Sequence, residues 1–259
     1  MKHPSLTRRT LWLAPIAMAL TACNGTAPHP SYPLSLSITT KSASTPSGLS
    51  ADIQIGGTGA NSLKITAAAV VLARIEVSPG GTCAPTGEED DCDELGVGPQ
   101  LLTLPVDGTT KVVLDGLVPA GTYSALHAKL DAVKADDDEK GASAFLTAHP
   151  DFAGVSVKVT GTFTDAQSVA HAFTFTSGAD AEIESAFNPP VTVGASTSNL
   201  TIAVDIASWF KDATGAAIDP TNTANAEAIE RNIARSFRAF EDDEHDGVDE
   251  HVEAPETPH

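Results

Sequence analysis

The sequence predicts an all-β protein, an antiparallel β-sandwich that ends in an amphipathic helix and an acidic tail. Three observations predict this fold: a long alternation of apolar and polar residues over 63–77, its return in several later segments, and glycine- and proline-rich turns between them. Successive side chains of a strand point to opposite faces, so the alternation indicates strands with one buried face. Many such strands separated by turns favour two packed sheets.

Segment 63–77 is the clearest of the predicted strands. Its apolar residues occupy every second position, and the alternation runs too long for the period of a helix. The other predicted strands cover residues 34–40, 49–55, 110–115, 122–133, 155–163, 169–176 and 200–206. Residues 164–168 are expected to join two of them as a hairpin.

An amphipathic helix is predicted over residues 222–240, packed on the sandwich. Its apolar residues recur at spacings of four and three and form one stripe: Ile229, Ile233, Phe237 and Phe240. The sandwich domain is therefore expected at 34–221, and an acidic tail is expected at 241–259.

The N-terminus has the pattern of an export signal. Cationic residues within positions 2–9 precede an apolar run at 11–20, which is too short to cross a bilayer. The run ends in Leu-Thr-Ala-Cys at 20–23, which resembles the lipobox of bacterial lipoproteins. This resemblance implies that the signal peptide, residues 1–22, is removed and that Cys23 carries the lipid.

The same resemblance implies a place in the cell envelope, with the membrane as partner through the lipid anchor. Two or more acyl chains hold a protein durably on a membrane. Asn24 stands where inner-membrane lipoproteins of this family usually carry aspartate, which favours the outer membrane, on its periplasmic or surface face. Residues 23–33 are expected to form the lipidated tether.

The charge of the chain excludes one class of partner. Lys and Arg number 15 and Asp and Glu number 34, which gives a net charge of −19 at pH 7. Such a chain repels nucleic acid. The acidic residues gather in runs at 88–94, 136–139 and 241–253, and runs of this kind are usually solvated loops.

Cys83 and Cys92 are the two cysteines that remain when Cys23 carries lipid. An even pair in an oxidising compartment predicts a disulfide that closes a short loop. The alternative is a pair of metal ligands, although the residues between them add no histidine.

The acidic tail contains a candidate calcium loop at residues 242–253. Oxygen donors stand at loop positions 1, 3, 5, 9 and 12, and Gly247 stands at position 6, which resembles the spacing of an EF-hand loop. The pattern also resembles the calcium-binding repeats of thrombospondin type 3. The predicted ligands are Asp242, Glu244, Asp246, Glu250, Glu253 and the backbone carbonyl of Val248. The alternative is an acidic tail in which such a spacing has no function.

One further segment carries a resemblance to known domains. Residues 117–123, Leu-Val-Pro-Ala-Gly-Thr-Tyr, look like the entry to a strand in prealbumin-like and immunoglobulin-like sandwiches. With the strand that ends at Pro79 and with the segment 205–210, they also resemble an uncharacterised domain of unknown function common in bacterial lipoproteins. This resemblance implies a fold, and it implies no catalytic residue.

The sequence contains no nucleophile elbow, no zinc-protease motif and no phosphate-binding loop. It therefore predicts a non-enzymatic binding or structural module of the envelope, with a protein or a carbohydrate as its partner. One alternative is an envelope hydrolase acting on polysaccharide, because pairs of catalytic acids have no local signature. The other is a periplasmic metal-binding lipoprotein. Its candidate ligands, His127, His149 and His171, are more simply explained as a solvent-facing residue at 127 and a buried or edge residue at 171.

Overall fold

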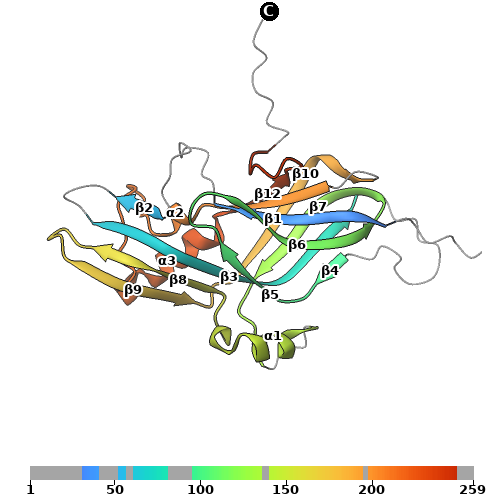
Figure 1. Cartoon of the computed structure of the whole chain (residues 1–259). Helices are drawn as coiled ribbons and strands as arrows, with labels where there is room; N and C mark the ends of the chain where they lie inside the picture. The colour runs from blue at the N-terminus through green and yellow to red at the C-terminus, as the bar shows by residue number, and fades with distance from the viewer. Residues whose placement is uncertain are drawn as a thin grey trace, which may run out of the picture.

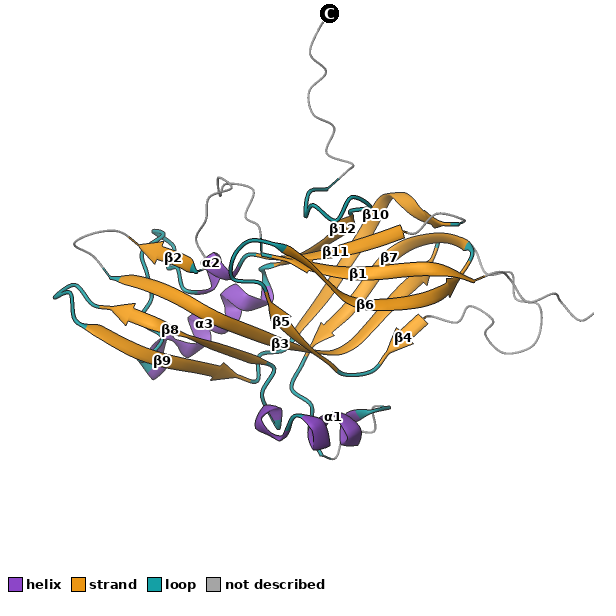
Figure 2. Cartoon of the chain, viewed as in Figure 1, coloured by secondary structure: helices purple, strands orange, loops and turns teal. Residues whose placement is uncertain are grey.

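The computed structural model describes residues 31–40, 52–56, 61–80, 95–135, 140–194 and 198–249, and strands dominate it. Two sheets form the frame (Figures 1 and 2). Sheet A has the order β12-β11-β1-β6, with β1 (Ser31–Thr39), β6 (Thr110–Pro119), β11 (Ser198–Val204) and β12 (Phe237–Glu241). Sheet B has the order β10-β7-β3-β8-β9, with β3 (Ser62–Pro79), β7 (Gly121–Leu130), β8 (Val157–Thr164), β9 (Ala170–Ser177) and β10 (Ala181–Val193).

Strand β3 organises sheet B. It is 18 residues long, so the strand predicted from the alternation over 63–77 is confirmed. It pairs with β7 and β8, and also with three short strands: β2 (Ile53–Gly56), β4 (Leu95–Val97) and β5 (Gln100–Leu104). At roughly 3.3 Å per residue it spans about 60 Å, and in Figure 1 it runs across most of the domain.

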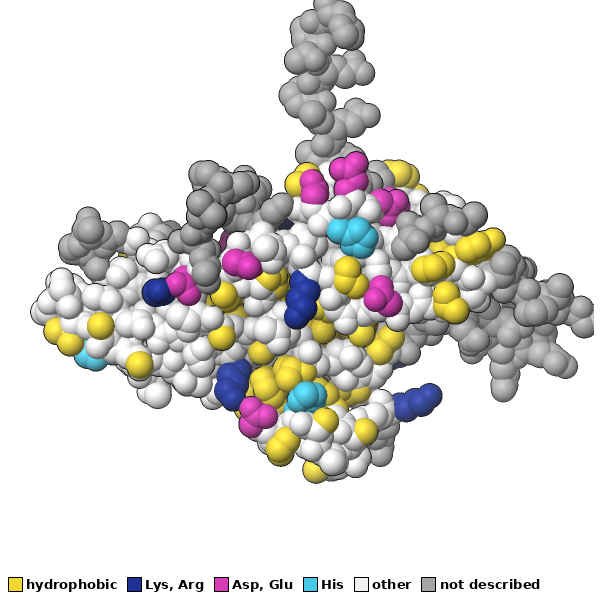
Figure 3. Space-filling view, in the orientation of Figure 1, with side chains coloured by type: hydrophobic (Ala, Val, Ile, Leu, Met, Phe, Trp, Pro, Cys, Tyr) yellow, Lys and Arg dark blue, Asp and Glu magenta, His cyan; other side chains and the backbone are white. Residues whose placement is uncertain are grey.

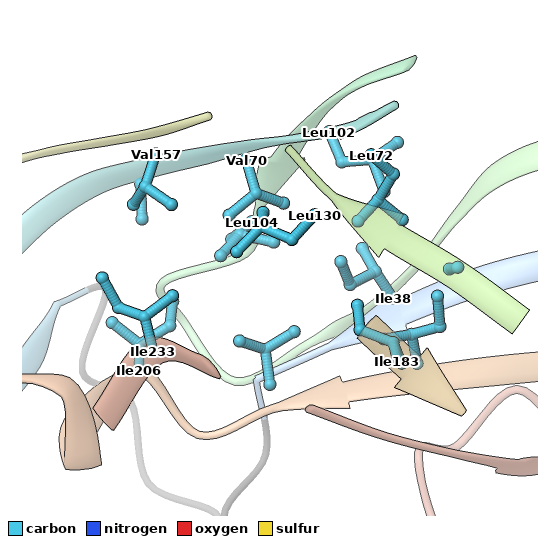
Figure 4. Packing of buried hydrophobic residues seen from close by; sticks show 14 of the residues in the cluster. Ile38, Val70, Leu72, Leu102, Leu104, Leu130, Val157, Ile183, Ile206 and Ile233 are labelled. Carbon is cyan, nitrogen blue, oxygen red and sulfur yellow. The ribbon is translucent and has the colours of Figure 1, made fainter. Parts of the chain in front are cut away.

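The two sheets share one apolar core. The alternating residues Leu36 and Ile38 of sheet A and Val70, Leu72 and Ile183 of sheet B belong to the same buried cluster, part of which Figure 4 shows from close by. Burying apolar surface at about 25 cal/mol per Å² is the main term that holds such sheets together. The period-two pattern of the sequence therefore marks the core face of both sheets.

Three short α-helices complete the fold. Helix α1 (Ala142–Ala148) and the 3₁₀ turn Pro150–Phe152 cover a second, smaller apolar cluster around Val71. Helices α2 (Ile206–Trp209) and α3 (Ala226–Ala234), the latter preceded by the 3₁₀ turn Thr223–Asn225, pack on the main core. They lie beside the half of sheet B that contains β8 and β9 (Figure 2).

The prediction of a helix over 222–240 is wrong beyond residue 234. Ile229 and Ile233 are buried on α3 as the stripe predicts, but Phe237–Glu241 form strand β12. Ser236 marks the change: its hydroxyl donates to the carbonyl of Ile233 at 2.7 Å and accepts the indole N–H of Trp209 at 2.7 Å. The residues that follow then pair with β11, because that strand offers a free ladder of backbone groups.

The prediction of purely antiparallel sheets needs one correction. Strands β1 and β11 pair in parallel, from Leu34 opposite Ser198 to Thr39 opposite Ala203. All other pairs between named strands in the described residues are antiparallel. The predicted hairpin at 164–168 is confirmed, with the Asp165 carboxylate accepting the N–H groups of Gln167 and Val169.

Candidate functional site at the acidic C-terminal segment

The acidic residues after β12 fold back over the outer face of sheet A. We call residues 242–249 the acidic cap. Asp242 N–H donates to the carbonyl of Asn199 at 3.0 Å, and Asn199 N–H donates to the Asp243 carboxylate at 3.0 Å. Further along the cap, Gly247 lies against Thr39 of β1 and Thr110 of β6. The cap therefore reaches from β11 to β6 and is a folded part of the domain.

The face beneath the cap consists of small polar side chains. Ser35, Ser37 and Thr39 of β1 and Asn199 and Thr201 of β11 are all buried. Both serine hydroxyls donate to the side-chain oxygen of Asn199, at 2.8 and 2.9 Å. The amide of Asn199 donates in turn to Thr201 Oγ1 at 3.1 Å and to the carbonyl of Asp242 at 2.8 Å. A polar network thus replaces water between the sheet and the cap.

Asp242 is the centre of this network. Its side chain has no exposed area, and its carboxylate accepts three hydrogen bonds. The donors are Thr201 Oγ1 at 2.8 Å and the backbone N–H groups of Asp246 and Gly247, each at 2.9 Å. Burying a carboxylate is costly unless it is hydrogen-bonded, so these donors are what make its position stable. Asp242 holds the cap closed.

Gly247 makes the turn of the cap possible. Its φ of +77° lies in the left-handed region, where a residue without Cβ is favoured. A Cβ at this position would lie 2.6 Å from Thr110 Oγ1 and 2.9 Å from Thr39 Oγ1. Backbone conformation and close packing therefore both require glycine here.

The predicted calcium ligands are only partly within the described residues. Asp242, Glu244, Asp246 and Val248 belong to the cap, whereas Glu250 and Glu253 lie outside the described residues. One carboxylate oxygen of Asp246 accepts the N–H of Val248 at 2.8 Å, and the Val248 side chain is 55% exposed. In the described ranges, no three His, Cys, Asp or Glu side chains converge as metal ligands. Calcium binding stays a prediction.

Comparisons with protein-family models, with curated proteins and with solved structures give no match. Within the described part of the chain, no helix has the length and hydropathy needed to cross a membrane.

The cysteines Cys23, Cys83 and Cys92 lie outside the described residues, and so do the acidic runs 88–94 and 136–139. The predicted lipid attachment and the predicted disulfide therefore stay predictions.

The three histidines lie on different elements: His127 on β7, His149 directly after α1 and His171 on β9. His171 lies at the start of the edge strand β9, exposed, with its Nε2 at 3.1 Å from the Asp165 carboxylate, as expected for an edge residue. His149 packs against the ring of Phe145 at 5.0 Å between centroids. His127 of β7 is half-buried, so the expectation of a fully solvent-facing side chain is only partly met.

Two rows of titratable side chains on the outer face of sheet B were not apparent from the sequence. His127 lies opposite Glu76 of β3 on one side and opposite Glu184 of β10 on the other. In the next row on the same face, Lys129 binds the carboxylates of Asp131 at 2.9 Å and Asp180 at 3.4 Å. The hydrogen bond to Asp131 raises the pKa of Lys129; burial would raise the pKa of Asp131, but the Lys129 contact and a backbone N–H lower it. Strand register, which no single segment encodes, places His127 between the two glutamates and brings Lys129 close to Asp180.

Proposed function

We propose that this chain is a lipoprotein of the outer membrane, anchored through Cys23, whose domain is a non-enzymatic binding or structural module. The sequence supports the anchor through the export signal and the lipobox-like residues 20–23. The partner we propose is a protein or a carbohydrate of the envelope.

One observation carries this proposal: the first strand after Cys23 is an inner strand. Strand β1 is paired on one side with β6 from Ser31 onward and on the other side with β11 from Leu34 onward. A load on the lipid anchor would enter a strand that is hydrogen-bonded on both sides, and the whole of sheet A would share it. An edge strand would peel away one hydrogen bond at a time. This attachment suits a domain that is held at a surface and contacted there by a partner.

We also propose that the fold is a sandwich of the prealbumin-like or immunoglobulin-like kind. It is supported by Tyr123, near the start of β7, whose hydroxyl donates to the carbonyl of Pro119 at 2.9 Å. Tyrosines that bond back to the backbone a few residues upstream occur at the corner between the two sheets of immunoglobulin-like sandwiches. Here Pro119 ends β6 of sheet A and Gly121 begins β7 of sheet B, so the tyrosine stands at such a corner.

The anchor is tested by replacing Cys23 with serine in the full chain. We expect the wild-type protein to appear in the membrane fraction with a lipid-modified N-terminal cysteine by mass spectrometry, and the Cys23→Ser protein to lose both properties. Cys83→Ser is the matched control, because it removes a cysteine that is expected to carry no lipid. Unchanged membrane retention of the Cys23→Ser protein together with unchanged labelling by a fatty-acid probe would contradict the proposal.

The binding role is tested by cross-linking in intact cells from the exposed hairpin between β8 and β9. A photo-reactive residue at Val169, which is 49% exposed, should capture a specific partner. The same residue introduced at the fully buried Val157 is the control for non-specific capture. Hydrolysis of envelope polysaccharide by the purified protein would instead favour the hydrolase alternative.

We propose calcium as the cofactor of the acidic cap. The sharp turn that the calcium spacing requires at Gly247 is present, with φ +77°. The Asp242 carboxylate already accepts three hydrogen bonds, so an ion would have to share it with them. The remaining oxygen donors would come from Glu244 and Asp246 and from residues beyond 249.

A further inference from the structure

The start of β1 lies at one end of the domain, beside the ends of several other strands. Ser31 of β1 lies opposite Pro119 of β6, and Pro79 of β3 lies opposite Tyr123 of β7. The end of β10 and the start of β11 also lie at this end of the domain, because Val193 lies opposite Gly121 and Ser198 lies opposite Leu34. We call residues 31–34, 77–80, 116–124 and 187–194 the uncharged end. In Figure 1 it is the right-hand end of the domain, where β1 begins.

The uncharged end differs in composition from the rest of the chain. None of its residues is Asp, Glu, Lys, Arg or His, in a chain of which charged residues make up 19% and whose net charge is −19. The opposite end, formed by the β8–β9 hairpin and the start of β3, carries the ion pairs Asp165–His171 and Asp52–Lys64. In the described residues the two ends of the domain thus differ in charge, whereas the acidic run 88–94, in the segment that joins Gly80 to Leu95, lies outside them.

The uncharged end also exposes apolar side chains. Leu117 is 66% exposed, the largest exposed fraction among the large apolar residues of the described chain. It lies opposite Pro33, which is exposed too, and Pro119, Pro189 and Pro190 are further exposed residues of this end. Apolar side chains are visible together at this end in the space-filling view (Figure 3). Tyr32, partly buried beside them, is a residue type favoured at the boundary between lipid and water.

The distance along the chain from Cys23 limits where this end can be. Residues 24–30 separate the cysteine from Ser31. Even fully extended, that stretch reaches less than about 30 Å at roughly 3.5 Å per residue. The domain is about twice as long, since β3 alone spans about 60 Å. An anchor on Cys23 therefore keeps the uncharged end near the lipid and allows the β8–β9 hairpin to stand well away from it.

We propose that the uncharged end rests on the lipid surface to which Cys23 is anchored, with Leu117 in contact with the lipid headgroup region. This inference rests on the proposed function, because it requires the anchor. The net negative charge of the chain disfavours an anionic surface, so the lipid in contact is of the zwitterionic class. The domain then stands upright and presents the β8–β9 hairpin to its partners.

The test uses the full lipidated protein in phosphatidylcholine vesicles and two tryptophan variants. Leu117→Trp and Val169→Trp place a reporter on exposed apolar positions at opposite ends of the domain. The tryptophan that remains after removal of the signal, Trp209, is fully buried and supplies the same background in both proteins. Quenching by lipids brominated near the headgroup reports contact with the bilayer.

We expect the brominated lipid to reduce the emission of the Leu117→Trp reporter at least about twofold and to leave the Val169→Trp reporter unchanged. Equal quenching of the two variants, whether strong or absent, overturns the proposed orientation. Flotation of the wild-type protein with the vesicles is measured first. A protein that fails to float overturns the anchor and the orientation together, whereas a protein that floats without quenching at position 117 overturns the orientation alone.

Discussion

Replacing Asp242 with alanine should destabilise the whole domain, although this residue lies in a segment whose composition suggests a solvated tail. The substitution removes an acceptor of three hydrogen bonds and leaves the Thr201 hydroxyl and two backbone N–H groups without their partner. Hydrogen bonds to a charged group contribute about 1.5–3 kcal/mol each, which gives an upper limit of roughly 5–9 kcal/mol. The cap can detach and let water reach these donors, so the observed loss is smaller. We expect about 3 kcal/mol.

Urea unfolding of the lipid-free Cys23→Ser protein measures this loss. With a slope of about 2–3 kcal/mol per M for a domain of this size, the midpoint should fall by roughly 1 M. Asp242→Asn keeps the shape and one acceptor oxygen and should fall between alanine and wild type. Asp115→Ala, which removes an exposed carboxylate from β6 of the same sheet, is the control and should leave the midpoint unchanged. Equal urea midpoints for Asp242→Ala and Asp115→Ala would show that the buried carboxylate of Asp242 does not stabilise the domain.

Three further predictions concern the turn, the corner and the ion. Gly247→Ala should lower the free energy of unfolding by about 1–3 kcal/mol. This loss should exceed that of Gly108→Ala, because Gly108 has a similar φ of +73° but open space around its Cβ position. Equal losses in urea unfolding would show that the packing of residue 247 against sheet A has no effect. Burial raises the pKa of Tyr123 above the ordinary tyrosine value of about 10, so its contribution to stability is complete below pH 10 and is lost as the pH rises through the higher folded-state pKa. Tyr123→Phe should be about 0.5–1.5 kcal/mol less stable than wild type below pH 10, because it lacks the hydrogen bond. When the pH rises above 10, the stability of the wild type should fall more than that of Tyr123→Phe in thermal unfolding scans. Parallel pH profiles of the two proteins would contradict this. Calcium at about 1 mM, which is in the affinity range of extracellular modules, should raise the melting temperature of the wild-type protein. It should not raise that of a Glu244→Gln, Asp246→Asn double variant that retains Asp242. Equal shifts of the melting temperature in the two proteins would show that the cap is a purely structural element.

The strands with regular alternation could be predicted from the sequence, and β10 could not. Its apolar residues alternate from Ala181 to Phe187, but Pro189 and Pro190 interrupt the pattern and argue against a strand. In the structure the register with β7 shifts between Ala186 and Val191, so the prolines lie where the ladder is interrupted, on the edge strand of sheet B. The sequence shows where the alternation is interrupted. Whether a strand can continue past the two prolines depends on its pairing with the neighbouring strand β7.

The helix prediction failed at β12 for a related reason. Spacings of four and three residues up to Phe240 fit a helical stripe, and nothing local distinguishes them from a helix followed by a strand. The outcome depends on β11, more than thirty residues earlier, which lacks a second neighbour until Phe237–Glu241 pair with it. Tertiary pairing here overrides local propensity.

The candidate site carried one signal that sequence reasoning missed. The outward positions of β1, Ser35, Ser37 and Thr39, are small, polar and uncharged, and so are Asn199 and Thr201 of β11. A face open to solvent in so acidic a chain would be expected to carry some charge. The run of Ser, Thr and Asn therefore indicated a covered face, although the segment that covers it could be identified only from the structure.

The place of β1 between two distant strands sets the order in which the domain can mature. Its neighbours are β6, about eighty residues later, and β11, which begins at Ser198. Until the C-terminal part of the chain arrives, β1 and β6 can form only a two-stranded ribbon, and such ribbons are marginally stable in water. Closure of sheet A, and of the cap over it, must wait until β11, β12 and residues 242–249 are available. Contacts of this sequence separation form slowly, so we expect sheet A to close late in the folding of the domain.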